Sequence, residues 1–130
     1  MDYSKAIFVF GSNEGGFHGA GAAKFALDHK GAILRVPEGP QGQSYAIPTK
    51  DTSIRNTLSL EEIQRYVVRF IAYAMVHPEL KFQVTRIGCG LAGLKDEEVA
   101  PMFIGAPDNC WFDTAWEPWV GEDRNYWGHK

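Results

Sequence analysis

Apolar positions along the chain fall into two patterns, short continuous runs and longer stretches with helical spacing. Residues 6–10 form a continuously apolar run that ends at Gly11, which is typical of a central strand buried on both faces of a sheet. Further strands are expected at 32–34, 44–47, 82–87 and 109–112. Because helical segments separate these strands, we expect a mainly parallel sheet.

The clearest helix is expected to begin after Ser59, because Ser59 and Glu62 have the spacing of a capping box. The apolar side chains that follow recur at helical spacing and form one core-facing stripe. They are Leu60, Ile63, Val67, Phe70, Ile71 and Ala74. Pro78 ends this helix, an alanine-rich helix is expected to close at Gly31, and Asp96 is expected to cap a short third helix.

Strands that alternate with helices indicate an α/β protein, and we predict a three-layer α/β/α fold with a mainly parallel or mixed central sheet. The 130 residues are a typical length for a single domain, here residues 1–130. Residues 113–130 form an aromatic C-terminal tail that is rich in tryptophan and shows no hydrophobic period. In such folds ligands bind in loops at the carboxyl ends of the strands, so function is expected there.

Composition and charge narrow the classes of function. With 45% hydrophobic and 22% charged residues, the chain has the composition of a globular domain. A formal net charge of −3 gives no basic footprint, so no non-specific nucleic-acid binding is expected. Cys89 and Cys110 lie outside any CxxC pattern and are interpreted as small buried fillers, so neither a metal site nor a disulfide framework is expected. The chain has no signal-peptide core and no apolar run of ~18 residues, which predicts a cytoplasmic protein without membrane contact.

Two glycine-rich loops are the strongest candidates for a binding site. They span residues 11–21 and 88–93, and each is expected to connect a strand to a helix. Glycine lets the backbone approach a ligand closely, and the free N–H groups of a helix N-terminus attract anions. One such loop is as consistent with a tight turn as with an anion site. Two of them beside one cleft indicate a ligand that contains a diphosphate.

Residues 8–22, 46–50 and 86–94 carry a resemblance to a known family. The most specific segment is the last, with the sequence Arg-Ile-Gly-Cys-Gly-Leu-Ala-Gly-Leu. In order and spacing the three segments resemble the macrodomains, in particular the branch that contains terminal ADP-ribose protein glycohydrolase and the DNA ADP-ribosyl glycohydrolase antitoxins. The resemblance implies a macrodomain-like fold that binds ADP-ribose or an ADP-ribosylated macromolecule.

The resemblance also implies roles for individual residues, and it implies no cofactor. Lys50 stands where the branch has a catalytic lysine at the end of a strand. The first ligand loop, which meets the distal ribose, corresponds to Asn13, His18, Gly19, Ala20 and Gly21. The phosphate-binding loop corresponds to Gly88, Cys89, Gly90, Leu91, Ala92 and Gly93.

The chain departs from the family pattern at three places. The family usually opens with a strand that carries an adenine-reading aspartate, and no position before Ala6 matches it. Ala92 stands where the glycohydrolase has an aspartate that assists turnover. The resemblance stops beyond Trp111, so the tail departs as well. Its tryptophans either stack on the adenine or cover apolar surface, the second being the simpler interpretation. They are Trp116, Trp119 and Trp127.

Several polar residues have both a functional and a structural interpretation. As a nucleophile, the unprotonated amine of Lys50 attacks the anomeric carbon of the distal ribose; otherwise Lys50 is an exposed lysine at a strand end. Asp51 is either a base or a loop charge. Arg86 pairs either with a phosphate or, as we expect, with a surface carboxylate. We expect His18 to contact the ligand, although a histidine before a glycine is often structural.

The sequence leaves three hypotheses for the function. The leading one is an enzyme that hydrolyses ADP-ribose adducts of protein or nucleic acid, with Lys50 as nucleophile. The alternative is a non-catalytic module that binds or sequesters ADP-ribose or a related nucleotide. The third is a structural or host-interaction protein that keeps the fold without the ligand, which the missing adenine aspartate favours. The sequence does not indicate an oligomeric state.

Overall fold

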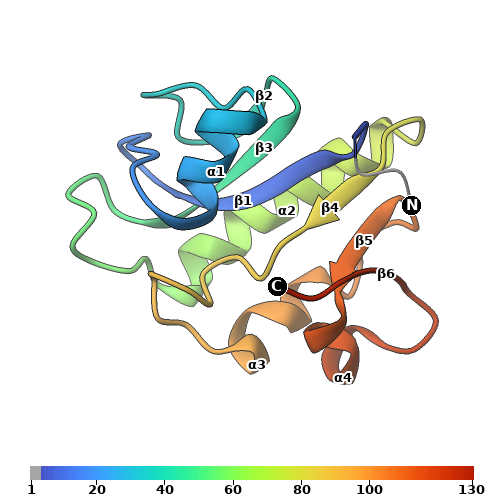
Figure 1. Ribbon diagram of the computed structural model, residues 1–130. Helices are drawn as coiled ribbons and strands as arrows, with labels where there is room; N and C mark the ends of the chain where they lie inside the picture. The colour runs from blue at the N-terminus through green and yellow to red at the C-terminus, as the bar shows by residue number, and fades with distance from the viewer. Residues whose placement is uncertain (1–3) are drawn as a thin grey trace.

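The computed structural model describes residues 4–130 and has a six-stranded mixed sheet at its centre (Figure 1). The strands follow the order β2-β3-β1-β4-β5-β6 across the sheet. Neighbouring strands are parallel except β2 and β3, which form an antiparallel pair at one edge. The bounds are Ile7–Asn13 for β1, Gly39–Gln41 for β2, Ser44–Lys50 for β3, Phe82–Val84 for β4, Cys110–Asp113 for β5 and Asn125–Gly128 for β6.

Helices of very different lengths connect the strands. Helix α1 spans Gly21–His29 and follows β1, and α2 spans Leu60–Val76 between β3 and β4. The remaining helical turns are Asp96–Val99 for α3, Ala100–Phe103 for η1, Thr114–Trp116 for η2 and Glu117–Val120 for α4. No helix within residues 4–130 is long and apolar enough to cross a membrane.

The helices cover both faces of the sheet, and Figure 1 shows α1 and α2 on opposite sides of it. Because side chains alternate along a strand, Phe8 and Phe10 of β1 pack with α1, whereas Val9 between them packs with α2. The α2 side holds the larger core, in which Phe70 packs its ring at 5.3 Å from that of Phe82. The protein therefore has the three-layer α/β/α fold with a mixed sheet that the sequence predicts.

The predicted ends of the two longer helices are confirmed. At the start of α2 the Ser59 hydroxyl accepts the Glu62 N–H at 3.2 Å, and the Glu62 carboxylate accepts the Ser59 N–H at 3.3 Å. Gly31 follows the last residues of α1 with a φ of +71°, in the left-handed region that glycine adopts without strain.

Four predicted strand segments are wrong in extent or type. Strand β3 does not stop at Ile47 but runs through Pro48 to Lys50, because it stays paired with β1 as far as Asn13. Residues 32–34 form no strand, because the Ile33 N–H donates to the Gln41 side chain at 2.8 Å instead of joining a ladder. Strand β1 continues past Phe10 to Asn13, alongside β3. Strand β4 ends at Val84, because the Ile87 N–H turns back to the Thr85 carbonyl at 2.8 Å and begins a loop.

The aromatic tail contains a strand that the sequence does not indicate. The sequence predicts the last strand at 109–112, whereas β6 is a further strand that pairs in parallel with β5. The β6 strand has only four residues, and none of its side chains is fully buried, so it leaves no alternating pattern to detect. Trp116 of the same tail is completely buried in the larger core.

On the α1 side, only half of the sheet is covered by a packed core. The cluster beneath α1 draws its residues from β1, β3, α1 and their neighbours, and none of the described members comes from β4, β5 or β6. Side chains on this uncovered half, among them Gln83, Thr85 and Asp113, line a cleft instead. The fold therefore places an open cleft beside α1 and over the carboxyl ends of the central strands.

Candidate functional site

The cleft has a volume of about 1060 Å³, which is at the upper end of small-molecule binding sites. The loops after β1, β3 and β4 contribute to its wall, and Figure 1 shows these loops gathered at one end of the sheet. This is the position at which open α/β sheets bind ligands, since the carboxyl ends of parallel strands meet there. Both glycine-rich loops and Lys50 reach this cleft.

The first loop is held in shape by its own hydrogen bonds. The Asn13 amide donates to the Phe17 carbonyl at 2.9 Å, and its carbonyl oxygen accepts the Phe17 N–H at 2.9 Å. Gly16 has a φ of +70°, and a Cβ there would lie 2.6 Å from the Arg35 backbone, so glycine is required. Asn13 lines the cleft, but these bonds make it chiefly an organiser of the loop.

The N-terminus of α1 faces the cleft without a cap. Its N-cap residue Ala20 has no side chain able to accept a hydrogen bond, and the first turn contains no acidic residue. The first helical bond runs from the Lys24 N–H to the Ala20 carbonyl at 3.2 Å, so the preceding N–H groups of Gly21, Ala22 and Ala23 have no helical acceptor. All three residues line the cleft. They offer hydrogen-bond donors and the positive end of the helix dipole to an anion.

The second loop presents another set of free donors. The N–H groups of Cys89 and Gly93 donate within the loop, to the carbonyls of Arg86 and Gly90 at 3.1 and 3.0 Å. Four further N–H groups of this loop have no acceptor among residues 4–130. They belong to Gly88, Gly90, Leu91 and Ala92, which all line the cleft. Successive unpaired N–H groups form a concave nest that suits an anion.

The two sets of donors lie side by side. A Cβ added at Gly21 would lie 3.3 Å from the Leu91 side chain, so the start of α1 and the second loop approach within van der Waals contact. The Thr57 hydroxyl donates to the Ala92 carbonyl at 2.7 Å and ties the second loop to the loop after β3. The loops therefore form one continuous wall, as expected for neighbouring phosphate positions.

Lys50 ends β3 and is half-buried in the same wall. Among the described residues its ammonium group has no ion pair and no hydrogen bond. The neighbouring Asp51 carboxylate accepts from Ser53 at 2.6 Å and Asn56 at 2.9 Å, and these bonds hold the pKa of Asp51 below its usual value. Asp51 is thus a loop-organising charge, and the Lys50 amine is left for a ligand.

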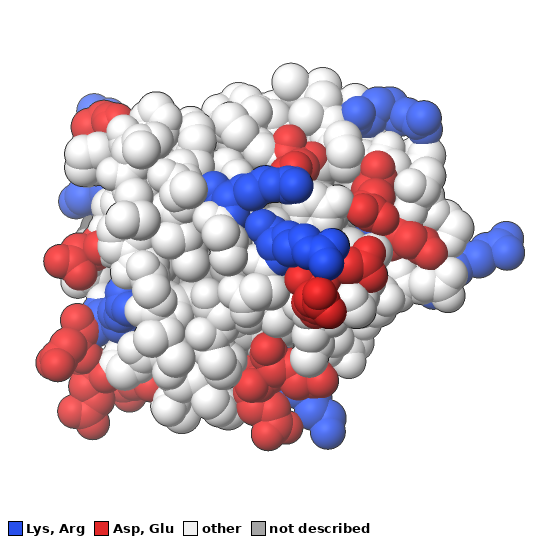
Figure 2. Space-filling view, turned by 180° about the vertical axis from the view of Figure 1, so that it is seen from behind, with Lys and Arg blue, Asp and Glu red and all other residues white. Residues whose placement is uncertain are grey.

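The cleft concentrates positive charge in an acidic protein. Its lining contains the cations Lys30, Lys50 and Lys130, together with Arg86, which is paired with Asp96 outside the lining, and a single side-chain carboxylate, Asp113, among the described residues, although the whole chain has a net charge of −3. Figure 2, seen from the side opposite to Figure 1, shows acidic and basic side chains interspersed. Such a local excess of cations favours an anionic ligand.

Two of the residues expected at the site do not line the cleft. One is Gly93, at the end of the second loop. His18 is 1% exposed, and its Nε2 lies 3.2 Å from the Gln41 side-chain oxygen, which as an acceptor requires the proton on Nε2. The imidazole also packs edge-on against Phe10 with ring centroids 5.3 Å apart. These contacts give His18 a structural role beneath the first loop.

Replacing His18 by alanine is expected to lower the free energy of unfolding by about 2–4 kcal/mol, because the substitution leaves a cavity and removes a buried hydrogen bond. The affinity of the folded protein for ADP-ribose should stay within about twofold. Urea denaturation and calorimetric titration measure the two quantities, with exposed His29→Ala as a control. A variant that loses affinity but not stability would make His18 a ligand contact.

The cysteines and tail tryptophans lie in distinct environments. Burial, the largest cause, raises the pKa of the Cys89 and Cys110 thiols to about 12, so neither presents a thiolate at neutral pH.

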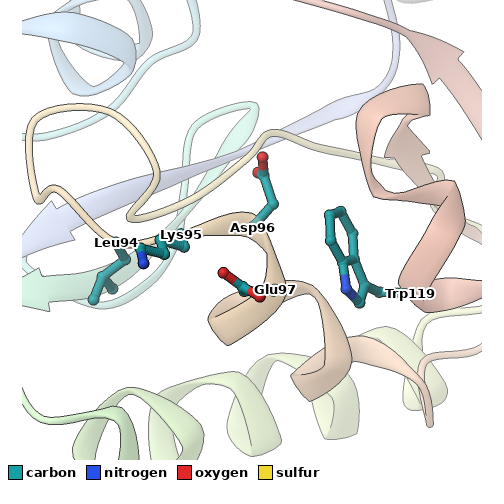
Figure 3. A pocket seen from close by; sticks show the side chains of 5 residues that line it. All are labelled: Leu94, Lys95, Asp96, Glu97 and Trp119. Atoms are coloured by element: carbon teal, nitrogen blue, oxygen red, sulfur yellow. The ribbon is translucent and has the colours of Figure 1, made fainter.

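Trp119 lines a separate depression of about 310 Å³, which Figure 3 shows between α4 and the start of α3. Trp127 lines the cleft, where its indole Nε1 donates to the Val84 carbonyl at 2.9 Å. Of the tail tryptophans, Trp127 is the one that reaches the cleft.

Reasoning from the sequence missed Asp113 and the end of the chain as parts of the site. Buried Asp113 accepts hydrogen bonds from the Ala115 N–H at 2.8 Å, the His129 imidazole at 2.7 Å and the Lys130 N–H at 3.2 Å. These contacts anchor the segment after β6 beside the cleft. The sequence signal was an aspartate directly after the apolar residues of β5, which is a common position for site residues in parallel sheets.

Comparison with known proteins supports the fold. No protein-family model and no curated protein matches the chain. One solved structure that resembles it is that of a protein of unknown function from Bacteroides thetaiotaomicron, with a TM-score of 0.52 over 75% of this chain and 78% of that chain. The two sequences are 16% identical, so the likeness shows a shared α/β architecture alone.

Proposed function

We propose that the protein binds ADP-ribose or a related diphosphate nucleotide in the cleft. The observation that carries the proposal is the convergence of two sets of unpaired N–H groups, from the start of α1 and from residues 88–92, on one positively charged wall. A diphosphate needs many hydrogen-bond donors within a short distance, and backbone N–H groups supply them without side-chain entropy cost. The macrodomain resemblance of the same two loops supports ADP-ribose as the nucleotide.

The catalytic half of the proposal assigns Lys50 as the nucleophile for hydrolysis of ADP-ribose adducts. Its unprotonated amine forms a bond to the anomeric carbon of the distal ribose, and the bond to the attached carboxylate or base breaks with the electron pair leaving on that group, which takes up the proton that the new secondary ammonium releases. Water then hydrolyses the lysine adduct and restores the amine. Support comes from the place of Lys50 at the end of β3, next to Asn13 of β1 and in the same cleft wall as the second loop. The Lys50 ammonium group also has no carboxylate partner within residues 4–130.

A second function remains a candidate, a module that binds the nucleotide without turnover. The observation that favours it is the lack of a free base at the site: Ala92 offers no carboxylate, and the one cleft-lining carboxylate among the described residues, Asp113, is occupied by its own hydrogen bonds. In that case Lys50 serves to neutralise phosphate charge. Measuring both turnover and ADP-ribose binding in Lys50→Ala separates the two functions.

Calorimetric titration with ADP-ribose tests the binding proposal directly, with AMP and ribose 5-phosphate as partial ligands. We expect a micromolar Kd for ADP-ribose, a binding free energy of about −8 kcal/mol, and much weaker binding of both fragments. If ADP-ribose binds no better than ribose 5-phosphate, the cleft does not recognise the diphosphate nucleotide and the proposal fails.

The adenine is placed by this proposal at the Trp127 end of the cleft, where an aromatic face replaces the missing aspartate. Trp127→Ala should weaken ADP-ribose binding about tenfold or more, because stacking on one base contributes about 1–3 kcal/mol. Ribose 5-phosphate has no base, so its affinity should not change. Trp119→Ala is the matched control, because Trp119 lines the other depression. Equal losses for both ligands would show that Trp127 shapes the cleft and does not read the base.

A further inference from the structure

Arg86 combines an ion pair with a place in the cleft wall. It lies just beyond β4, its side chain is 30% exposed, and it lines the cleft. Its Nε donates to one oxygen of Asp96 at 2.8 Å and its Nη2 to the other at 2.6 Å. The expected ion pair therefore forms, but it does not remove the guanidinium from the site.

The geometry of this pair leaves donors for a ligand. A guanidinium has five N–H groups, and Asp96 accepts from one edge only, through Nε and Nη2. Among residues 4–130 the Nη1 group donates to no acceptor. Asp96 lines the separate depression that also holds Trp119, and it does not line the cleft. Figure 3 shows its side chain pointing away from Glu97. Asp96 therefore leaves the Nη1 group unpaired in a side chain that lines the cleft.

Asp96 is fixed in turn by the tail. The indole Nε1 of Trp116 donates to the same carboxylate at 2.8 Å. Trp116 is completely buried, with its ring centroid 5.3 Å from that of Phe103 and 6.3 Å from that of Phe112. The chain of contacts from Trp116 through Asp96 to Arg86 therefore connects the larger core to the cleft wall.

We infer that Arg86 is a phosphate-binding residue of the cleft and that Asp96 and Trp116 are its positioning residues, so that the C-terminal tail sets the affinity for the diphosphate. This inference rests on the proposed binding of a diphosphate nucleotide. The paired carboxylate cancels much of the net charge of Arg86, so its contribution is directed hydrogen bonding from a guanidinium already held in place. A guanidinium that Asp96 already holds in place loses less conformational entropy on binding a ligand than a free arginine side chain does.

Titration of wild type, Arg86→Gln and Arg86→Lys with ADP-ribose and with pyrophosphate tests the inference. Arg86→Gln should weaken both ligands by a similar factor of about 10–100, because a charge-assisted hydrogen bond to phosphate is lost from each. Arg86→Lys keeps an ion pair with Asp96 but cannot present a second donor edge, so about a tenfold loss is expected for both. Thermal unfolding of each variant shows that the fold is retained.

The positioning role has its own pair of variants. Trp116→Phe keeps an aromatic ring in the core but removes the donor to Asp96, and it should weaken both ligands about threefold to tenfold. Phe112→Leu disturbs the same core without touching the contact, so it should lower stability and leave affinity unchanged.

The outcomes separate this inference from the function on which it rests. If wild type binds neither ligand, the proposed function fails and the inference fails with it. If wild type binds both and the Arg86 variants bind equally well, only the inference is overturned. If the Arg86 variants lose affinity but Trp116→Phe does not, the tail does not set the affinity and that part of the inference is wrong.

Discussion

Replacing Lys50 by alanine is expected to lower the hydrolysis of ADP-ribose adducts by at least ~10³-fold while ADP-ribose binding changes little, because the substitution removes the proposed nucleophile but none of the backbone N–H groups proposed to hold the diphosphate. Release of ADP-ribose from a modified protein and from a modified oligonucleotide measures turnover, and calorimetry measures binding. Use of both substrates also shows which of the two linkages is cleaved.

The control for Lys50→Ala is Lys5→Ala, which removes an equal charge from an exposed position. Lys5 lies just before β1, at the end of that strand that is remote from the cleft. It should leave turnover and affinity unchanged. Turnover that survives in Lys50→Ala would remove the nucleophile assignment. If the wild type shows no measurable turnover and Lys50→Ala weakens ADP-ribose binding, the protein is instead the non-catalytic module, in which Lys50 only neutralises phosphate charge.

Replacing Ala20 by aspartate is expected to raise stability and abolish tight binding in the same protein. Ala20 is exposed and has the extended backbone of an N-cap, with φ −155° and ψ 162°, so an aspartate can accept the first-turn N–H groups of α1. Capping should raise the free energy of unfolding by about 1 kcal/mol. The same carboxylate occupies the anion position and repels a phosphate, so ADP-ribose affinity should fall about 100-fold or more.

Ala20→Ser separates the cap from the charge, since serine accepts the same N–H groups but is neutral. It should stabilise α1 with a much smaller loss of affinity. Urea denaturation and calorimetry provide both numbers for each variant. An aspartate variant that is stabilised yet binds ADP-ribose as well as wild type would show that the start of α1 is not a phosphate position.

The prediction of helix α2 and of the start of the first strand was accurate, because the signals for both are local. A capping box at Ser59, an apolar stripe and a continuous apolar run each specify their element within a few residues of sequence. The strand predicted at 32–34 was wrong because the Gln41 side chain captures the Ile33 N–H. The β6 strand was missed because its parallel pairing with β5 depends on residues more than ten positions away.

For the site, the sequence by itself determined which loops contain glycine and, through the family resemblance, indicated Lys50 at the end of a strand. These are properties of residue types at positions next to predicted elements. Only the tertiary structure decided which side chains share the cleft, because strand order and loop packing bring distant segments together. It placed Trp127 and Asp113 in the cleft and His18 beneath it, with its imidazole on Gln41. A sequence pattern predicts an element, whereas the neighbours of that element follow from the packing of the whole chain.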